Sequence, residues 1–182
     1  MGTRERLLEN GAALFAVKGF HGVGVEELGL SVGLTGPSIY RHFRTKGALL
    51  AEMLISASNA LLEGAIEVIA QNLGPKATLS GLIERHVEFA ISYPDLIRVH
   101  ERDFNNLAED EARHVRRLQR RYVELWVEQI QLVRINERPE SARTMAHAVF
   151  GLLNSTPRLQ SGQQRNEVAA LMLGLGQRAL FS

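Results

Sequence analysis

The sequence predicts an all-α protein, and three observations support this fold class. Apolar residues recur at three- and four-residue spacing along most of the 182 residues, as in amphipathic helices. No segment alternates apolar and polar residues over six or more positions, as a half-buried strand would. Glycine or proline stands between the periodic segments, where such residues end or begin helices. We therefore expect about nine helices and no strands.

The expected helices follow from the apolar spacing and from the residues that interrupt it. Gly19 ends the first helix, because glycine readily adopts the left-handed conformation at a helix C-terminus. Thr35 is a good N-cap for the third helix, and Pro37 in its first turn has no N–H to leave unpaired. After the first helix, which ends at residue 18, we expect helices at residues 25–32, 35–43, 46–72, 77–92, 95–104, 108–135, 140–155 and 165–181, with a polar loop at 157–164.

Composition excludes several classes of protein. The chain has no cysteine, which rules out disulfides, thiolate metal sites and cysteine nucleophiles. No run of about 18 apolar residues is present, and the N-terminal segment lacks the apolar core of a signal peptide, so we expect a cytoplasmic protein. The net charge is only +1, so an argument for nucleic-acid binding must depend on where charges lie.

Residues 23–46 are the most informative segment, with the sequence VGVEELGLSVGLTGPSIYRHFRTK. Two short helices separated by a turn at Gly33 form a helix-turn-helix. The second helix begins with small residues, so its N-terminal end can approach the major groove closely. Ile39 and Phe43 are four residues apart and face inward, which leaves Ser38, Tyr40, Arg41 and His42 for bases and phosphates. Thr35 and Thr45 stand at helix starts, where free N–H groups favour phosphate.

The segment GLTGPSIYRHFRTKGALL, residues 33–50, resembles the recognition-helix signature of the tetracycline-repressor (TetR/AcrR) family of bacterial transcription regulators. The resemblance covers about residues 3–55. It implies a helix-turn-helix domain at residues 1–48 and a ligand-binding and dimerisation domain at 49–182. It also implies DNA contacts, with Tyr40 and Lys46 at phosphates. The full expected DNA-binding set is Gly24, Val25, Glu26, Thr35, Gly36, Pro37, Ser38, Tyr40, Arg41, His42 and Lys46.

Some of these positions depart from the family pattern or admit a second interpretation. Gly24 replaces the usual hydroxyl residue at the start of the second helix, and Gly29 replaces the usual small alanine. Glu26 stands where an arginine or polar residue is common; it either accepts from cytosine N4 or simply favours its helix N-terminus. Tyr40 and His42 either contact DNA or pack against the domain.

The C-terminal part predicts a homodimer. The helices at 140–155 and 165–181 are apolar around most of their circumference and need covering on two sides. Gly151, Gly174 and Gly176 would permit close helix approach. We expect these two helices of each subunit to form an isologous four-helix bundle, the alternative being helices wholly buried in a monomer. Two recognition helices would then read a palindromic operator.

The resemblance further implies that the helices between residues 46 and 135 enclose a small-molecule effector. The expected lining is mostly apolar with few polar groups, as in ligand pockets generally. Its histidines and Trp126 could instead be satisfied core residues. The candidates are Met53, Ala57, Ala60, Leu61, His86, Phe89, Tyr93, His100, Phe104, Tyr122, Trp126 and Asn154.

A run of cations on the 108–135 helix admits two interpretations. It is either a solvated face paired with nearby acids or the mouth for an anionic or acyl-type effector. The run consists of Arg113, Arg116, Arg117, Arg120 and Arg121.

Taken together, these patterns predict a ligand-responsive repressor that binds double-stranded DNA as a dimer. Ligand would displace the helix at 46–72, whose start lies beside the recognition helix, and so shift the population away from the DNA-bound state. The alternative is a DNA-binding regulator without a small-molecule effector, controlled by a protein partner or acting as an activator. No catalytic motif is present, so we expect no enzyme, cofactor or metal site.

Overall fold

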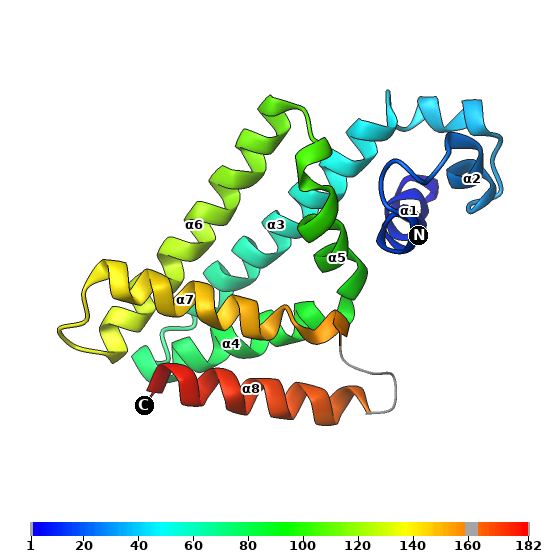
Figure 1. Cartoon of the computed structure of the whole chain (residues 1–182). Helices are drawn as coiled ribbons and strands as arrows, with labels where there is room; N and C mark the ends of the chain where they lie inside the picture. Colours follow the sequence, from blue (N-terminus) through cyan, green and yellow to red (C-terminus); the bar gives the residue numbers. More distant parts are fainter. Residues whose placement is uncertain (1, 159–163, 182) are drawn as a thin grey trace. The chain divides into compact units, whose positions relative to one another are not determined.

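The computed structural model describes residues 2–158 and 164–181, and over these residues the chain is all-α (Figure 1). The described residues form eight α-helices and three 3-10 helices, with no strand, which confirms the predicted fold class. The α-helices are α1 Thr3–Lys18, α2 Val25–Leu30, α3 Lys46–Ala70, α4 Pro75–Ser92, α5 Pro94–Asp103, α6 Glu109–Val133, α7 Pro139–Leu153 and α8 Arg165–Phe181. The 3-10 helices are η1 Gly36–Arg41, η2 Phe104–Asn106 and η3 Thr156–Arg158.

Helix ends agree with the sequence prediction to within a few residues, with one change of type. Gly19 ends α1 with φ 79°, and Gly33 turns the chain with φ 76°, both conformations that favour glycine. The expected third helix is a 3-10 helix of six residues rather than an α-helix, so the prediction was wrong in its hydrogen-bond pattern. Of the polar loop expected at 157–164, residues 159–163 lie outside the described residues.

The chain divides into two compact units. Unit 1 comprises Met1–Ser58 and Asp95–Arg116, and unit 2 comprises Asn59–Pro94 and Arg117–Ser182. Three helices, α3, α5 and α6, contribute residues to both units. The functional division at 1–48 and 49–182 is a separate question and stays a prediction.

Unit 1 has a continuous apolar core. The inward faces of α1, α2 and η1 pack on the N-terminal half of α3, with contributions from α5 and α6. Burying such side chains supplies most of the driving force for folding. Its buried members include Leu7, Phe15, Leu28, Ile39, Phe43, Leu49, Leu50, Leu54, Val99 and Val115.

Unit 2 is built around α4, α7 and α8, which lie side by side (Figure 1). Gly176 of α8 lies where α4 comes nearest, because a Cβ on Gly176 would stand 2.8 Å from Cγ2 of Ile83. Buried side chains of unit 2 include Leu79, Leu82, Ile83, Trp126, Ile130, Leu153 and Leu180.

Helix α3 is long and apolar enough to cross a membrane by length and composition alone. Its N-terminal half instead fills the core of unit 1, where Leu49, Leu50, Met53 and Leu54 are at most 2% exposed. A core helix passes the same test as a membrane helix, and packing accounts for the apolar character of the N-terminal half of α3.

Candidate nucleic-acid interface and ligand-binding region

The helix-turn-helix is held together by close approach of backbone. The amide of Leu34 donates to the carbonyl of Gly29 at 2.9 Å, which closes the turn between α2 and η1. A Cβ on Gly29 would lie 2.8 Å from the carbonyl oxygen of Leu34, closer than real Cβ atoms come to backbone. An alanine at this position would therefore force the turn to shift, and glycine removes that clash.

The 3-10 helix η1 and the two residues after it separate an inward face from an outward face, as the spacing predicts. Ile39 is 2% exposed and Phe43 is 3% exposed, and both belong to the core of unit 1. Tyr40 between them is 53% exposed. Arg41 is also exposed, so the two side chains best suited to phosphate or base contact point to solvent.

The remaining candidate DNA contacts differ in exposure, and their roles stay predictions. Gly36 is buried, and a Cβ there would lie 3.2 Å from Cα of Glu26. Exposed residues are Gly24, Glu26, Thr35 and Pro37, and half-buried ones are Val25, Ser38, His42 and Lys46.

The two threonines at helix starts behave differently. Thr35 has the extended backbone of an N-cap, but its hydroxyl pairs with the hydroxyl of Ser38 at 2.8 Å rather than capping an amide. The hydroxyl of Thr45 accepts from the amide of Ala48 at 3.0 Å and so caps α3.

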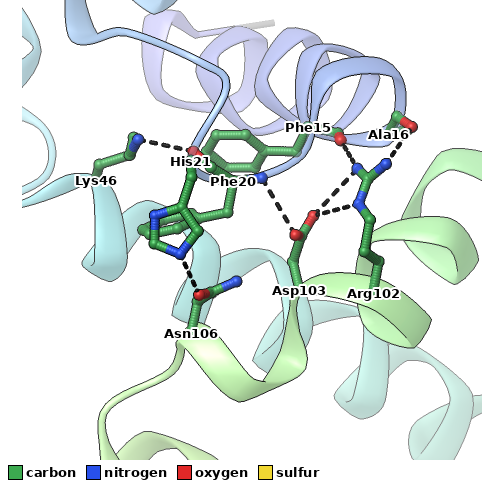
Figure 2. Close-up of polar contacts among 8 residues, drawn as sticks. All are labelled: Phe15, Ala16, Phe20, His21, Lys46, Arg102, Asp103 and Asn106. Carbon is green, nitrogen blue, oxygen red and sulfur yellow. Dashed lines mark hydrogen bonds and ion pairs between the residues drawn. The ribbon is translucent and has the colours of Figure 1, made fainter.

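Lys46 is engaged within unit 1. Its ammonium donates to the carbonyl of Phe20 at 2.7 Å (Figure 2). It also donates to the carbonyl of Val23 at 2.8 Å and lies 4.5 Å from the centre of the Phe20 ring. An ammonium has three N–H donors, so a phosphate contact would have to use the third or displace one carbonyl. In this structure Lys46 fixes the loop that leads into α2.

Sequence analysis missed a polar cluster that joins α5 and η2 to the end of α1 (Figure 2). We call Arg102, Asp103 and Asn106 the α5 clasp. Arg102 donates to the carbonyl of Ala16 at 3.2 Å and also to that of Phe15, which satisfies acceptors at the C-terminus of α1.

The other two members of the α5 clasp hold the loop after α1. Asp103 is 4% exposed and accepts from the amide of Phe20 at 3.2 Å. Nε2 of His21 lies 2.7 Å from Oδ1 of Asn106 (Figure 2). The partners are more than 80 positions apart in the sequence, so no local pattern could have revealed them.

Unit 2 brings four predicted effector residues together in what we call the aromatic cluster: His86, Tyr122, Trp126 and Asn154, with Phe150 between their rings. Nδ1 of His86 lies 2.9 Å from the hydroxyl of Tyr122, and Nε2 lies 3.0 Å from Oδ1 of Asn154. The Phe150 ring centre is 5.1 Å from that of His86 and 4.9 Å from that of Trp126.

Burial controls the protonation of this cluster. It lowers the pKa of His86 from 6.5 to about 4, against the opposing effect of the Asn154 hydrogen bond. The neutral ring can donate from Nε2 to Asn154 and accept at Nδ1 from the Tyr122 hydroxyl. Burial also raises the pKa of Tyr122, which keeps that hydroxyl protonated.

Trp126 carries the unsatisfied group of the cluster. It is fully buried, and its indole Nε1 has no partner of good hydrogen-bond geometry within the described part of the chain, although its interaction with the Tyr122 hydroxyl opposes the rise that burial causes in the pKa of Tyr122. A buried donor without an acceptor is costly, on the order of 1–3 kcal/mol. An acceptor on a bound molecule would recover that cost.

The other predicted effector residues lie elsewhere. Leu61, Phe89 and Tyr93 line, with Ala60, a small pocket of about 170 Å³ in unit 2. Met53 is 2% exposed in the core of unit 1, and Ala57 also belongs to that unit. The rings of His100 and Phe104 are 5.3 Å apart in unit 1, whereas the aromatic cluster belongs to unit 2. All of these assignments stay predictions.

Two family profiles match the chain. "Bacterial regulatory proteins, tetR family" matches residues 7–53, and "Tetracyclin repressor-like, C-terminal domain" matches residues 72–158. The chain belongs to the tetR family. The members of this family are regulatory proteins, which confirms the expectation that the chain is not an enzyme.

The curated relatives match the chain at low identity or over a short segment. The HTH-type transcriptional repressor KstR2 of Rhodococcus jostii is 26% identical over 127 residues, 69% of this chain and 62% of the relative. The uncharacterized HTH-type regulator YdgC of Bacillus subtilis is 42% identical over 52 residues, 29% of this chain and 27% of the relative. The aligned part thus spans less than two thirds of these curated relatives.

Solved structures share the fold of this tetR-family chain over nearly its whole length. KstR2 of Mycobacterium tuberculosis superposes with a TM-score of 0.84 at 17% identity, covering 100% of this chain and 96% of the other. AibR, solved with isovaleryl coenzyme A and operator DNA, superposes with a TM-score of 0.79 at 16% identity, covering 96% and 97%. At such identities the likeness concerns the fold.

Proposed function

We propose that this chain is a cytoplasmic transcriptional repressor that binds a palindromic operator as a homodimer and releases it when unit 2 binds a small molecule. The outward face of η1 carries this proposal. Tyr40 and Arg41 point to solvent while Ile39 and Phe43 anchor the segment in the core, so the exposed side chains are presented from a fixed base. That arrangement suits entry into a major groove.

The DNA-binding part of the proposal is tested by selecting bound sequences from a random duplex pool and then measuring affinity at several salt concentrations. Arg41→Gln should weaken binding by about tenfold, within the range for one lost charged contact. If Arg41 contacts phosphate, the slope of log affinity against log salt should fall by about one. Arg138→Gln removes an exposed charge from unit 2 and serves as the matched control. An equal loss of DNA affinity in Arg41→Gln and Arg138→Gln would contradict the proposal.

The homodimer is supported by the surface of α7 and α8. Leu171 is 50% exposed and Phe181 is 37% exposed on α8. A Cβ on Gly151 of α7 would meet no atom within 4 Å, and on Gly174 it would meet only the Arg178 side chain. Large apolar side chains beside small residues on an open face suit close packing against a second copy of the same helices.

Effector control is supported by the aromatic cluster. Its Trp126 indole has no partner of good geometry and can donate to a bound acceptor, and its neutral His86 imposes no charge on an apolar ligand. A relative of the same fold, AibR, is seen with both an acyl thioester and operator DNA. A ligand that binds unit 2 better in the DNA-free state would shift the population toward that state, and α3, which contributes to both units, is a direct covalent route for the change.

Effector control is tested by screening metabolites for release of the selected operator. A compound that lowers operator affinity, and whose effect is lost in Trp126→Phe, would support the proposal. Should no compound change operator affinity, the chain is a DNA-binding regulator controlled by a protein partner instead. Placing the operator upstream or downstream of a reporter promoter distinguishes a repressor from an activator.

A further inference from the structure

Unit 2 carries an open groove that differs from the aromatic cluster. Its volume is about 490 Å³, within the usual range for small-molecule sites. Leu62 and Ile66 of α3 and Leu125 of α6 form an apolar floor. Arg117, Arg120, Arg121 and Glu124 of α6 complete the lining. We call it the arginine groove.

The three arginines of the groove have no ion pair or hydrogen bond with any residue that the structure describes. The rest of the arginine run behaves differently. Arg113 pairs with Glu109 and Asp110, and Arg116 pairs with Glu109 at 3.5 Å. The run predicted from sequence is therefore two sets, one paired with acids at the start of α6 and one unpaired at the groove.

The acidic residue of the groove does not neutralise these cations. Both carboxylate oxygens of Glu124 accept from Nη2 of Arg143 on α7, each at 2.8 Å. The groove thus keeps three positive charges at i, i+3 and i+4 on one helix. Like charges at these spacings repel one another, and a bound anion would relieve that repulsion.

The apolar floor of the groove indicates that the ligand also has an apolar part beside its anionic part. Leu62 is only 5% exposed at the bottom of the groove, whereas Ile66 is 45% exposed beside it. A flexible acyl chain can reach a recessed leucine, but a flat bilayer surface cannot. Guanidinium groups bind phosphate oxygens through paired hydrogen bonds. The ligand that satisfies both surfaces has an apolar chain and several phosphate oxygens.

We propose that the arginine groove binds a soluble acyl thioester whose carrier bears phosphate groups. The acyl chain lies on Leu62, Ile66 and Leu125, and the phosphates lie against Arg117, Arg120 and Arg121. Binding of this thioester to the groove does not depend on the proposed function. Only the regulatory consequence, a change in operator affinity on binding, depends on it.

The test is calorimetric titration of the full chain with octanoyl-coenzyme A at physiological salt. In one variant Arg117, Arg120 and Arg121 are all replaced by Gln. This variant should bind the probe at least about tenfold more weakly, because a single charge-assisted hydrogen bond is worth that much. The matched control replaces the paired Arg113 and Arg116 by Gln and should bind the probe like the unmodified chain. Thermal unfolding confirms that both variants are folded.

Further titrations identify which ligand occupies the arginine groove. Coenzyme A alone and octanoate alone should each bind more weakly than octanoyl-coenzyme A, and Ile66→Asn should reduce the advantage of the acylated probe. Equal binding by the triple variant and the unmodified chain would overturn the inference, as would a preference for phosphatidylglycerol vesicles over the soluble probe. Operator binding is measured in parallel. If the operator binds but the probe does not, the inference about the arginine groove is wrong and the proposed function stands. If the operator does not bind, the proposed function is wrong, whatever the result with the probe.

Discussion

Units 1 and 2 differ in how their polar groups are partnered. In unit 1, Asp103 and Lys46 are joined to backbone groups of the segment between α1 and α2, so these contacts fix the loop that leads into α2. In unit 2, His86 is hydrogen-bonded to Tyr122 and Asn154, but the buried Trp126 indole has no partner of good geometry and the exposed groove arginines have no ion pair with a described residue. The polar contacts of unit 1 thus hold distant segments together, whereas unit 2 leaves several donors without a partner among the described residues.

The largest effect should come from breaking the proposed dimer face of unit 2. Leu171→Glu places a charge at the centre of the α8 surface and should give a monomer, because burying an unpaired charge is very costly. Operator affinity should fall by about 100-fold or more, since linked binding of two half-sites contributes at least that. Light scattering and operator titration measure the two effects. Leu132→Glu, at a similarly exposed leucine of α6, is the control and should leave both unchanged.

The second effect concerns the buried histidine of unit 2. Between pH 6.5 and about 4 the unfolded chain holds a proton on His86 that the folded chain does not, so acidification favours unfolding. The free energy of unfolding should fall by about 3 kcal/mol from this group between pH 7 and pH 4.

Denaturant unfolding of the unmodified chain and His86→Gln across this pH range isolates that contribution from the carboxylates common to both. The variant should lose less stability on acidification. Parallel pH dependences of the two proteins would show that His86 is not held neutral by burial.

A smaller effect is expected in unit 1 from the α5 clasp. Asp103→Ala leaves the Phe20 amide without its acceptor and should reduce the free energy of unfolding by about 1–3 kcal/mol. Asp95→Ala, which removes only an exposed pair with Arg98, should cost less than about 1 kcal/mol. Urea denaturation compares the two. Equal losses of unfolding free energy in the two variants would mean that the α5 clasp does not fix the loop after α1.

The smallest effect distinguishes the two interpretations of Tyr40. If its hydroxyl contacts phosphate, Tyr40→Phe should weaken operator binding by about tenfold or less, the value of one hydrogen bond. The melting temperature should not change, because the ring is 53% exposed. A lower melting temperature with unchanged operator affinity would assign Tyr40 to packing instead.

Much of unit 1 could be predicted because its signals are local. Gly19 ends the first helix and Gly33 lies in the turn at the positions that the sequence predicts, both with positive φ, and Ile39 and Phe43 face inward as their spacing requires. The helical type of η1 was missed, because six residues make only about two turns, too few for the spacing of apolar residues to distinguish a 3-10 helix from an α-helix. In unit 2 the sequence identified His86, Tyr122, Trp126 and Asn154 as candidates but missed Phe150, which lies between their rings.

The helical class, the helix-turn-helix and the family could be inferred from the chain alone, because these depend on short-range periodicity and on residues adjacent in the chain. The fold was needed to establish which charges are paired and which polar groups are left without partners. It assigned Lys46 to two backbone carbonyls and divided the arginine run into a paired and an unpaired set. Such outcomes depend on contacts between residues far apart in sequence, and no local pattern encodes them.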